Sequence, residues 1–198
     1  MTKITVCRKI IFLILLLFIL ATGALPANAA EAVIDRSQDS WGLLGGYGQS
    51  FSGLGRTTER VATIDLVPRY NRRLFTDIGT GWYRGFHSIM IELPLHLVVN
   101  PEVSTMIGAN FLANYTFTAG QHMRPYLFGG GGPVYSFADV PGMGAELNGN
   151  YQFGLGLEYD NCCHTYLAEL RFHHISNAGS EEPNIPLNSF KLLVGISF

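Results

Sequence analysis

Apolar and polar residues alternate along most of the chain after about residue 40, in segments of about ten residues separated by turn residues. The last segment shows this most clearly, because its large apolar residues share one face of a strand and its small or charged residues share the other. The first set is Phe190, Leu192, Val194, Ile196 and Phe198, and the second is Lys191, Gly195 and Ser197. Alternation with a period of two is typical of a β-strand with two different faces. No window shows a helical stripe, so the pattern predicts an all-β fold.

Eight such segments are expected to form strands, with boundaries uncertain by two to four residues. They are 41–49, 59–70, 86–98, 104–117, 123–135, 147–159, 165–175 and 190–198. An even number of strands is typical of single-chain bacterial membrane barrels. A soluble sandwich shows the same alternation with its apolar face buried, so periodicity alone does not separate the two. The terminal Phe198, the aromatic strand ends and the start of the chain favour an eight-stranded antiparallel transmembrane β-barrel of the outer membrane.

The start of the chain has the layout of a secretory signal peptide. Basic residues precede an uninterrupted apolar run at Ile10–Leu20, and Ala27-Asn28-Ala29 has the small-x-small pattern of a cleavage site. The apolar run of eleven residues is shorter than the about 20 that a membrane-spanning helix needs. We therefore expect residues 1–29 to be cleaved and residues 30–198 to form a single outer-membrane barrel domain.

Charge and cysteine content exclude several classes of function. Cleavage would remove three positive charges and no negative one, which takes the formal charge from −2 to −5. No basic patch then remains to displace counterions from a nucleic acid. Cys162 and Cys163 are adjacent and cannot form a disulfide framework. With His164 they offer only three crowded ligands, whereas a structural zinc site normally takes four. We expect no metal and no cofactor.

The connections between the predicted strands differ in length. If both chain ends are periplasmic, the short connections 118–122 and 160–164 are periplasmic, and the longer ones at 136–146 and 176–189 are extracellular. The interior of an eight-stranded barrel is filled by side chains and forms no open pore.

The fifth predicted strand is unusual in composition. Pro125 and Pro133 are tolerated near strand ends but not in the middle. The run Gly129–Gly132 predicts a bulge or a close packing contact.

The seventh predicted strand separates two kinds of side chain. By alternation, Tyr166, Ala168, Leu170, Phe172, His174 and Ser176 share the lipid-facing side. On the other side, Glu169, Arg171 and His173 are expected to point inward and to form an interior polar network with Glu158. The tyrosines expected in an aromatic girdle at the membrane interfaces are Tyr47, Tyr115, Tyr126, Tyr151, Tyr159 and Tyr166.

A histidine and a serine on a lipid-facing side are costly unless they are satisfied or functional. His174 and Ser176, at i and i+2 on one face, can approach the distance that an activated hydroxyl nucleophile needs. Asn177 follows directly and can offer a side-chain or backbone donor to an oxyanion. The alternative is that these residues are merely interfacial polar residues at the rim of the barrel.

The segment His174-Ile175-Ser176-Asn177-Ala178-Gly179, followed by Pro183-Asn184 and Asn188 before the last apolar strand, resembles the C-terminal motif of PagL-type lipid A 3-O-deacylases. Proteins of this family are outer-membrane esterases that remove the 3-linked acyl chain of lipid A. The resemblance implies Ser176 as the nucleophile, His174 as the general base and Asn177 as part of the oxyanion hole.

One position departs from the family pattern. In the family pattern the third catalytic residue is a glutamate about a dozen residues after the serine. In this chain Asn188 stands at that place. An asparagine carbonyl can hold a histidine ring in one tautomer, but it lacks the charge that stabilises an imidazolium. Asn188 therefore either supports His174 in a slower enzyme or marks an inactive one. Glu181 or Glu182 could substitute, although both are expected to be solvated loop charges.

Three functions remain open on the sequence. The first is a lipid A deacylase whose partners are lipopolysaccharide and the surrounding outer-membrane lipids, with a homodimer possible and the active site facing the outer leaflet. The second is a non-catalytic structural or adhesive barrel. The third, an acyltransferase or phospholipase, is disfavoured by the spacing of the motif.

Overall fold

The computed structural model describes residues 38–120, 122–137, 140–161 and 164–198 of the chain. Its strands are β1 (Asp39–Ser50), β2 (Ala62–Ile78), β3 (Gly85–Glu92), β4 (Leu95–Asn100), β5 (Ser104–Gly108), β6 (Asn110–Phe117), β7 (Met123–Ser136), β8 (Leu147–Asp160), β9 (Thr165–Ser176) and β10 (Leu187–Ser197). A single 3-10 turn, Gly81–Tyr83, lies between β2 and β3. Within the described residues, no helix is long and apolar enough to cross a membrane.

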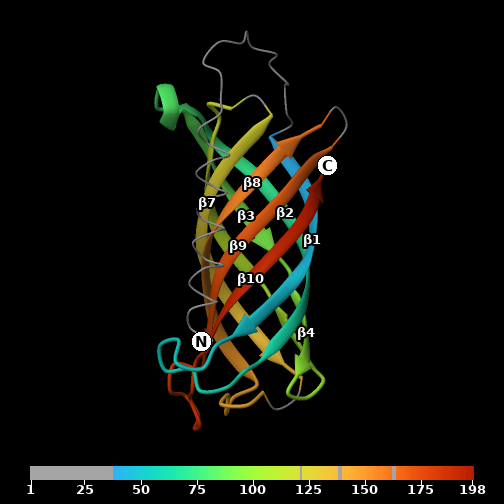
Figure 1. The fold of residues 1–198 in the computed structure, drawn as a ribbon. Coiled ribbons are helices and arrows are strands. Elements are labelled where there is room, and N and C mark those ends of the chain that lie inside the picture. Colours follow the sequence, from blue (N-terminus) through green and yellow to red (C-terminus); the bar gives the residue numbers. More distant parts are fainter. Residues whose placement is uncertain (1–37, 121, 138–139, 162–163) are drawn as a thin grey trace, which may run out of the picture. The chain divides into compact units, whose positions relative to one another are not determined.

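These segments form one antiparallel sheet that closes on itself, because β1 pairs with both β2 and β10 (Figure 1). β3 and β4 together make one barrel strand, interrupted at Leu93-Pro94, and β5 and β6 make another, interrupted at Ala109. The predicted eight-stranded antiparallel barrel is therefore confirmed. The two interruptions lie side by side, since the N–H of Gly108 donates to the carbonyl of Pro94 at 2.9 Å.

The connections group at two ends of the barrel. The connections 51–61, 101–103 and 177–186, and the described residues after β7 (137 and 140–146), lie at one end, called here the site end and drawn at the bottom of Figure 1. The connection 79–84 and the described residues after β6 (118–120 and 122) and after β8 (161 and 164) lie at the other, the short-turn end. Residues 1–37, which include the expected signal peptide, lie outside the described residues, and so do Cys162 and Cys163.

The predicted strand boundaries agree with the structure to within three residues, except in β2. The prediction of 59–70 was wrong at its end, because β2 continues to Ile78. The residues after 70 have no regular alternation, but they pair with β3 as far as Ile78 opposite Gly85, through two register shifts. The extension of β2 beyond residue 70 therefore depends on pairing with β3 and not on a local sequence pattern.

β7 remains continuous through its glycines and prolines, and it pairs with β8 without a register shift. The expected close packing is present. A Cβ atom on Gly131 would lie 2.0 Å from the carbonyl oxygen of Asn150, and one on Gly132 would lie 1.9 Å from that of Ala109. Only glycine allows neighbouring backbones to approach this closely.

The barrel has apolar side chains outside and polar ones inside. Leu192 and Val194 are 61% and 60% exposed, whereas Glu92 and Arg171 are almost fully buried. This distribution inverts that of a soluble protein and is the one expected of a barrel that spans a membrane. At the site end an apolar cluster fills the interior, formed by Val61, Val98, Met106, Val134, Val140, Met143, Ile175 and Leu187.

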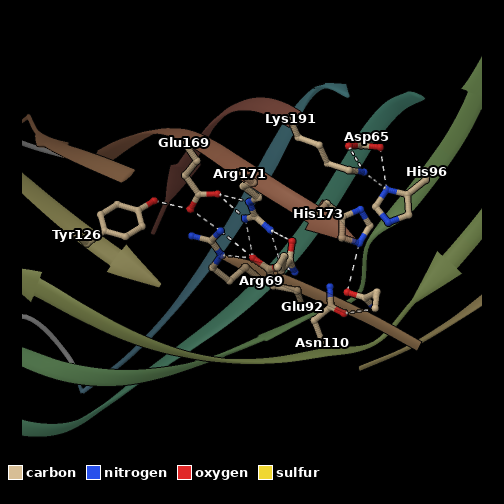
Figure 2. A network of polar contacts seen from close by, with 12 residues as sticks. Asp65, Arg69, Glu92, His96, Asn110, Tyr126, Glu169, Arg171, His173 and Lys191 are labelled. Carbon is tan, nitrogen blue, oxygen red and sulfur yellow. Dashed lines mark hydrogen bonds and ion pairs between the residues drawn. The ribbon is translucent and has the colours of Figure 1, made fainter. Parts of the chain in front are cut away.

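Charged side chains fill the middle of the barrel (Figure 2). Arg69 donates to Glu92 and Glu169 at 2.7 and 2.6 Å, and Arg171 contacts the same two carboxylates. Each buried charge is thereby paired, as burial in a low-dielectric interior requires. The inward orientation predicted for Glu169 and Arg171 is confirmed.

A second buried group lies beside the first. Lys191 donates to Asp65 at 2.7 Å, and His96 approaches the same carboxylate at 2.7 Å. The ring of His173 lies 5.5 Å from the ring of His96, so His173 also points inward as predicted.

One of the expected positions was wrong. Tyr126 is 2% exposed and donates its hydroxyl to Glu169 at 2.5 Å, so it belongs to the interior network and not to a girdle. It stands in the apolar run Tyr126-Leu127-Phe128, which does not reveal which face points inward. Glu158 lies on the inward face of β8 with Gln152 and Asp160, as predicted, and it pairs with Arg124 at 2.7 Å.

Candidate active site

One row of side chains crosses the outer face of β8, β9 and β10 near the site end. In the antiparallel register Tyr151 lies opposite His174, and His174 lies opposite Asn188. Directly paired residues point to the same side of a sheet, so the three side chains are neighbours. Register thus brings together two predicted site residues that are fourteen positions apart in the sequence.

His174 is held from two sides. Its Nδ1 lies 2.7 Å from Oδ1 of Asn188. Its ring stacks on the ring of Tyr151, with centroids 4.4 Å apart and planes inclined by 19°. These contacts fix both the position and the tilt of the imidazole.

The hydrogen bonds of Asn188 determine which nitrogen of His174 carries the proton. Nδ2 of Asn188 donates to the carbonyl of Leu54 at 3.0 Å and to Oγ1 of Thr57 at 2.9 Å. A carbonyl oxygen only accepts, so the NH2 group must face Leu54 and the amide oxygen must face His174. Nδ1 of His174 is then the donor, and in the neutral ring Nε2 keeps its lone pair. This is the tautomer of a general base.

The hydroxyl of Ser176 is hydrogen-bonded away from the histidine. Its Oγ donates to Oδ1 of Asn184 at 3.0 Å and accepts the N–H of Ala178 at 3.2 Å. Among the hydrogen bonds between described residues, none joins Ser176 to His174. The two side chains share one face of β9, as predicted, but no hydrogen bond joins them.

Asn177 is buried, and its side chain braces the connection that follows β9. Its Nδ2 donates to the carbonyl of Glu181 at 2.7 Å, and its Oδ1 accepts the N–H of Gly179 at 2.8 Å. Its backbone N–H lies 3.3 Å from Oδ1 of Asn184. The side chain expected at an oxyanion hole is therefore fully engaged, whereas the backbone N–H points to the same atom as the Ser176 hydroxyl.

Asn184 is the site residue that analysis of the sequence did not single out. Its amide oxygen accepts from both Ser176 and Asn177, which places it beside the predicted nucleophile. The signal available was its place in the Pro183-Asn184 part of the motif.

Glu181 and Glu182 are exposed, as expected of loop charges. The carboxylate of Glu182 accepts the backbone N–H of Asn184 at 3.2 Å. Nδ1 of His174 bonds to Asn188 and to neither glutamate. Asn188 is thus the residue that holds the imidazole.

A cavity of about 420 Å³ opens beside these residues. Its wall is built from the connection 51–61, from β8 and β9 and from the start of β10. The lining residues are Leu54, Gly55, Arg56, Tyr151, Phe172, His174, Ser176, Pro186 and Asn188. Opposite Ser176 in β8 stands Gly149, whose missing side chain leaves the space beside the hydroxyl free.

An aromatic surface continues from the cavity along the outside of the barrel. Phe172 stacks on Phe153 at 5.1 Å and contacts the edge of Phe190 at 5.8 Å. Phe153 is 54% exposed and Phe190 is 41% exposed. An apolar chain on this surface would end at Ser176 and His174. The described part of the chain contains no group of three or more His, Cys, Asp or Glu side chains placed to hold a metal ion.

Comparison with known proteins adds to this geometry. The model of the lipid A 3-O-deacylase (PagL) family matches residues 69–197. No curated protein matches the sequence. The crystal structure of the outer membrane enzyme PagL is similar, with a TM-score of 0.53 and 18% identity over 79% of this chain and 97% of that one.

A second similar structure is that of Neisserial surface protein A (NspA). It has a TM-score of 0.57 and 14% identity, over 81% of this chain and 96% of that one. At these identities the likeness shows the fold alone, which is that of the outer-membrane barrels.

Proposed function

We propose that this chain, which belongs to the lipid A 3-O-deacylase (PagL) family, hydrolyses the ester at the 3-position of lipid A. The family resemblance of the segment His174–Gly179 is confirmed by the match. The observation that carries the proposal is the His174–Asn188 hydrogen bond, which selects the neutral tautomer with its Nε2 lone pair free, on the face that also bears Ser176.

In the proposed mechanism, Ser176 is the nucleophile and His174 is the general base. The hydroxyl of Ser176 turns from Asn184 to Nε2 of His174, gives up its proton and attacks the carbonyl carbon of the 3-linked acyl chain. The sugar oxygen leaves with a proton from His174. Water then attacks the acyl-enzyme, and a fatty acid is released with the serine restored.

The negative charge that forms on the carbonyl oxygen needs hydrogen-bond donors close to Ser176. The backbone N–H groups of Asn177 and Ala178 both point into this region. For Asn177 the proposed role therefore falls on its backbone and not on its side chain. When the hydroxyl leaves Asn184, a half-turn of that amide would add Nδ2 as a further donor.

Substrate is proposed to reach the site from the membrane and not through the barrel. Buried side chains fill the interior, whereas the cavity opens on the outer surface beside exposed Phe153 and Phe190. We propose that the site end faces the outer leaflet, since this would place the aromatic surface alongside the acyl chains and Ser176 at the level of the head groups.

The test is mass spectrometry of lipid A after expression of the full chain in a bacterium whose lipid A keeps its 3-linked chain. We expect the loss of one 3-hydroxyacyl group with the native chain and no loss with Ser176→Ala. Ser197→Ala is the matched control, because this serine lies at the short-turn end and donates to the carbonyl of Trp41. It should deacylate like the native chain.

The competing function is a non-catalytic outer-membrane barrel. The observation in its favour is the hydrogen bond from Ser176 to Asn184 in place of His174. Unchanged lipid A, with the native barrel folded in the outer membrane by heat-dependent gel mobility, would reject the esterase in favour of this alternative.

A further inference from the structure

The connection 51–61 is attached to the segment that carries Asn188. The backbone forms a compact turn, in which the N–H of Gly53 donates to the carbonyl of Thr57 at 2.9 Å. Thr57 is 2% exposed, and its Oγ1 donates to the carbonyl of Pro186 at 2.8 Å while accepting the N–H of Asn188 at 2.9 Å. The backbone next to residue 56 is therefore fixed relative to the candidate active site.

Gly55 allows this turn to approach so closely. Its φ of +59° is strained for any residue with a side chain. A Cβ atom there would lie 3.0 Å from Nδ2 of Asn188. The glycine therefore allows the turn that carries residue 56 to reach the wall of the cavity.

Arg56 is the one lysine or arginine among the residues that line the cavity. It is exposed, and its guanidinium has no hydrogen-bond or ion-pair partner within the described part of the chain. The arginines of the barrel interior differ, because Arg69 and Arg171 are each paired with two carboxylates. Arg56 is thus an uncompensated cation in the same 420 Å³ cavity as Ser176 and His174.

We propose that Arg56 binds a phosphate group on the sugar backbone of the substrate and so directs the 3-linked ester to Ser176. This inference rests on the proposed function. Lipid A is a phosphorylated sugar that carries acyl chains, so one head group presents an ester and a phosphate together. A guanidinium offers a planar fork of donors that matches two phosphate oxygens. The aromatic surface would hold the chain and Arg56 the anionic head.

The test compares hydrolysis of lipid A with its phosphates and of the same lipid A after enzymatic dephosphorylation, both in micelles of an uncharged detergent. Arg56→Gln should lower kcat/KM for the phosphorylated substrate by roughly 10- to 100-fold, the range for a charged hydrogen bond. It should leave kcat/KM for the dephosphorylated substrate unchanged. Arg56→Lys should lie in between, because it keeps the charge and loses the fork.

Arg60→Gln is the matched control. Arg60 is exposed in the same connection but does not line the cavity. It should behave like the native chain with both substrates.

Three results would overturn the inference. One is an equal loss with both substrates in Arg56→Gln, which would mean that Arg56 only shapes the site. Another is an equal loss in Arg60→Gln, which would indicate general attraction to anionic lipid. The third is a loss of kcat/KM in Arg56→Gln on the dephosphorylated substrate once phosphatidylglycerol is added to the micelles. This result would mean that Arg56 binds the phosphate of a neighbouring lipid.

A binding measurement separates this inference from the proposed function. In the Ser176→Ala background, binding of phosphorylated and dephosphorylated lipid A is measured with Arg56 present and with Arg56→Gln. If the native chain hydrolyses neither substrate but binding depends on both phosphate and Arg56, the esterase is rejected and the phosphate site stands. If the native chain hydrolyses lipid A but binding depends on neither the phosphates nor Arg56, the esterase stands and the phosphate site is rejected.

Discussion

At the scale of single residues, the candidate site depends on how one amide is held. The NH2 group of Asn188 is fixed by Leu54 and Thr57, so its oxygen faces His174 and sets the tautomer of the ring. A carboxylate in this place could not donate to the Leu54 carbonyl. Asn188 stands where the family resemblance leads us to expect a glutamate, and its NH2 group finds an acceptor on the connection 51–61. It lacks the negative charge that would stabilise an imidazolium.

Substitution of Asn188 tests this arrangement. Asn188→Ala removes the acceptor of the Nδ1 proton, and we expect kcat for lipid A to fall by about 100-fold, the lower range for losing a positioned base. Gel mobility should show a folded barrel. A native rate in this variant would mean that His174 needs no such partner.

Asn188→Asp separates the two ends of the amide. It keeps an oxygen for His174 but places the other carboxylate oxygen about where Nδ2 lies, 3.0 Å from the carbonyl of Leu54. We expect thermal unfolding in detergent to show a loss of about 1–3 kcal/mol, the cost of an unsatisfied buried group. Unchanged stability would contradict the assigned orientation of the amide.

At the scale of elements, three connections of the site end brace one another. The N–H of Gly144 donates to the carbonyl of Pro183 at 2.7 Å, and the N–H of Ile185 donates to that of Gly142 at 2.8 Å. From the other side, Oγ1 of Thr57 in the connection 51–61 donates to the carbonyl of Pro186 at 2.8 Å. The strands place His174 and Ser176, and the braced connections place Asn184 and Arg56 beside them.

Gly144→Ala tests the bracing without touching the proposed catalytic groups. A Cβ atom there would lie 2.6 Å from the carbonyl of Glu182, so the connection that carries Asn184 must shift. We expect a loss in kcat/KM of roughly 10- to 100-fold, as for a displacement of about 1 Å. Gly129→Ala is the control, since its Cβ would meet ordinary contacts at 3.5 Å, and it should keep full activity. Equal activity of the two variants would show that the bracing is dispensable.

At the scale of the whole molecule, side chains fill the interior of the barrel. Paired charged side chains and apolar clusters lie inside, and further apolar side chains cover the outside, so the proposed chemistry has only the outer surface available. β9 shows this division within one strand, because Glu169 and Arg171 point inward while His174 and Ser176 point outward. The interior network holds the strand whose other face carries the site.

Glu169→Gln tests the structural role of the network. It leaves Arg69 and Arg171 each with one carboxylate fewer in a buried setting, and we expect a loss of about 3–5 kcal/mol in the free energy of unfolding. Unfolding in denaturant, followed by tryptophan fluorescence, measures this loss. Glu102→Gln, at an exposed position in the turn after β4, should change stability by less than about 0.5 kcal/mol. A similar small effect at Glu169 would refute the role.

The sequence by itself determined the number of barrel strands, most of their boundaries and the faces of β8, β9 and β10. It could do so because a strand has a period of two, so each residue's neighbours at i±2 reveal the side to which it points. For the same reason the outward position of His174 and Ser176 followed from the sequence alone, together with the motif that indicates the family.

Only the tertiary structure decided the length of β2, the inward position of Tyr126 and the partner of Glu158. It also revealed Asn184, the orientation of Asn188 and the place of Arg56. These features depend on contacts between distant segments, such as Asn188 with Thr57, which are 131 positions apart. A hydrogen bond across that separation leaves no periodic trace in either segment, because it is set by the closure of the barrel and the packing of its connections.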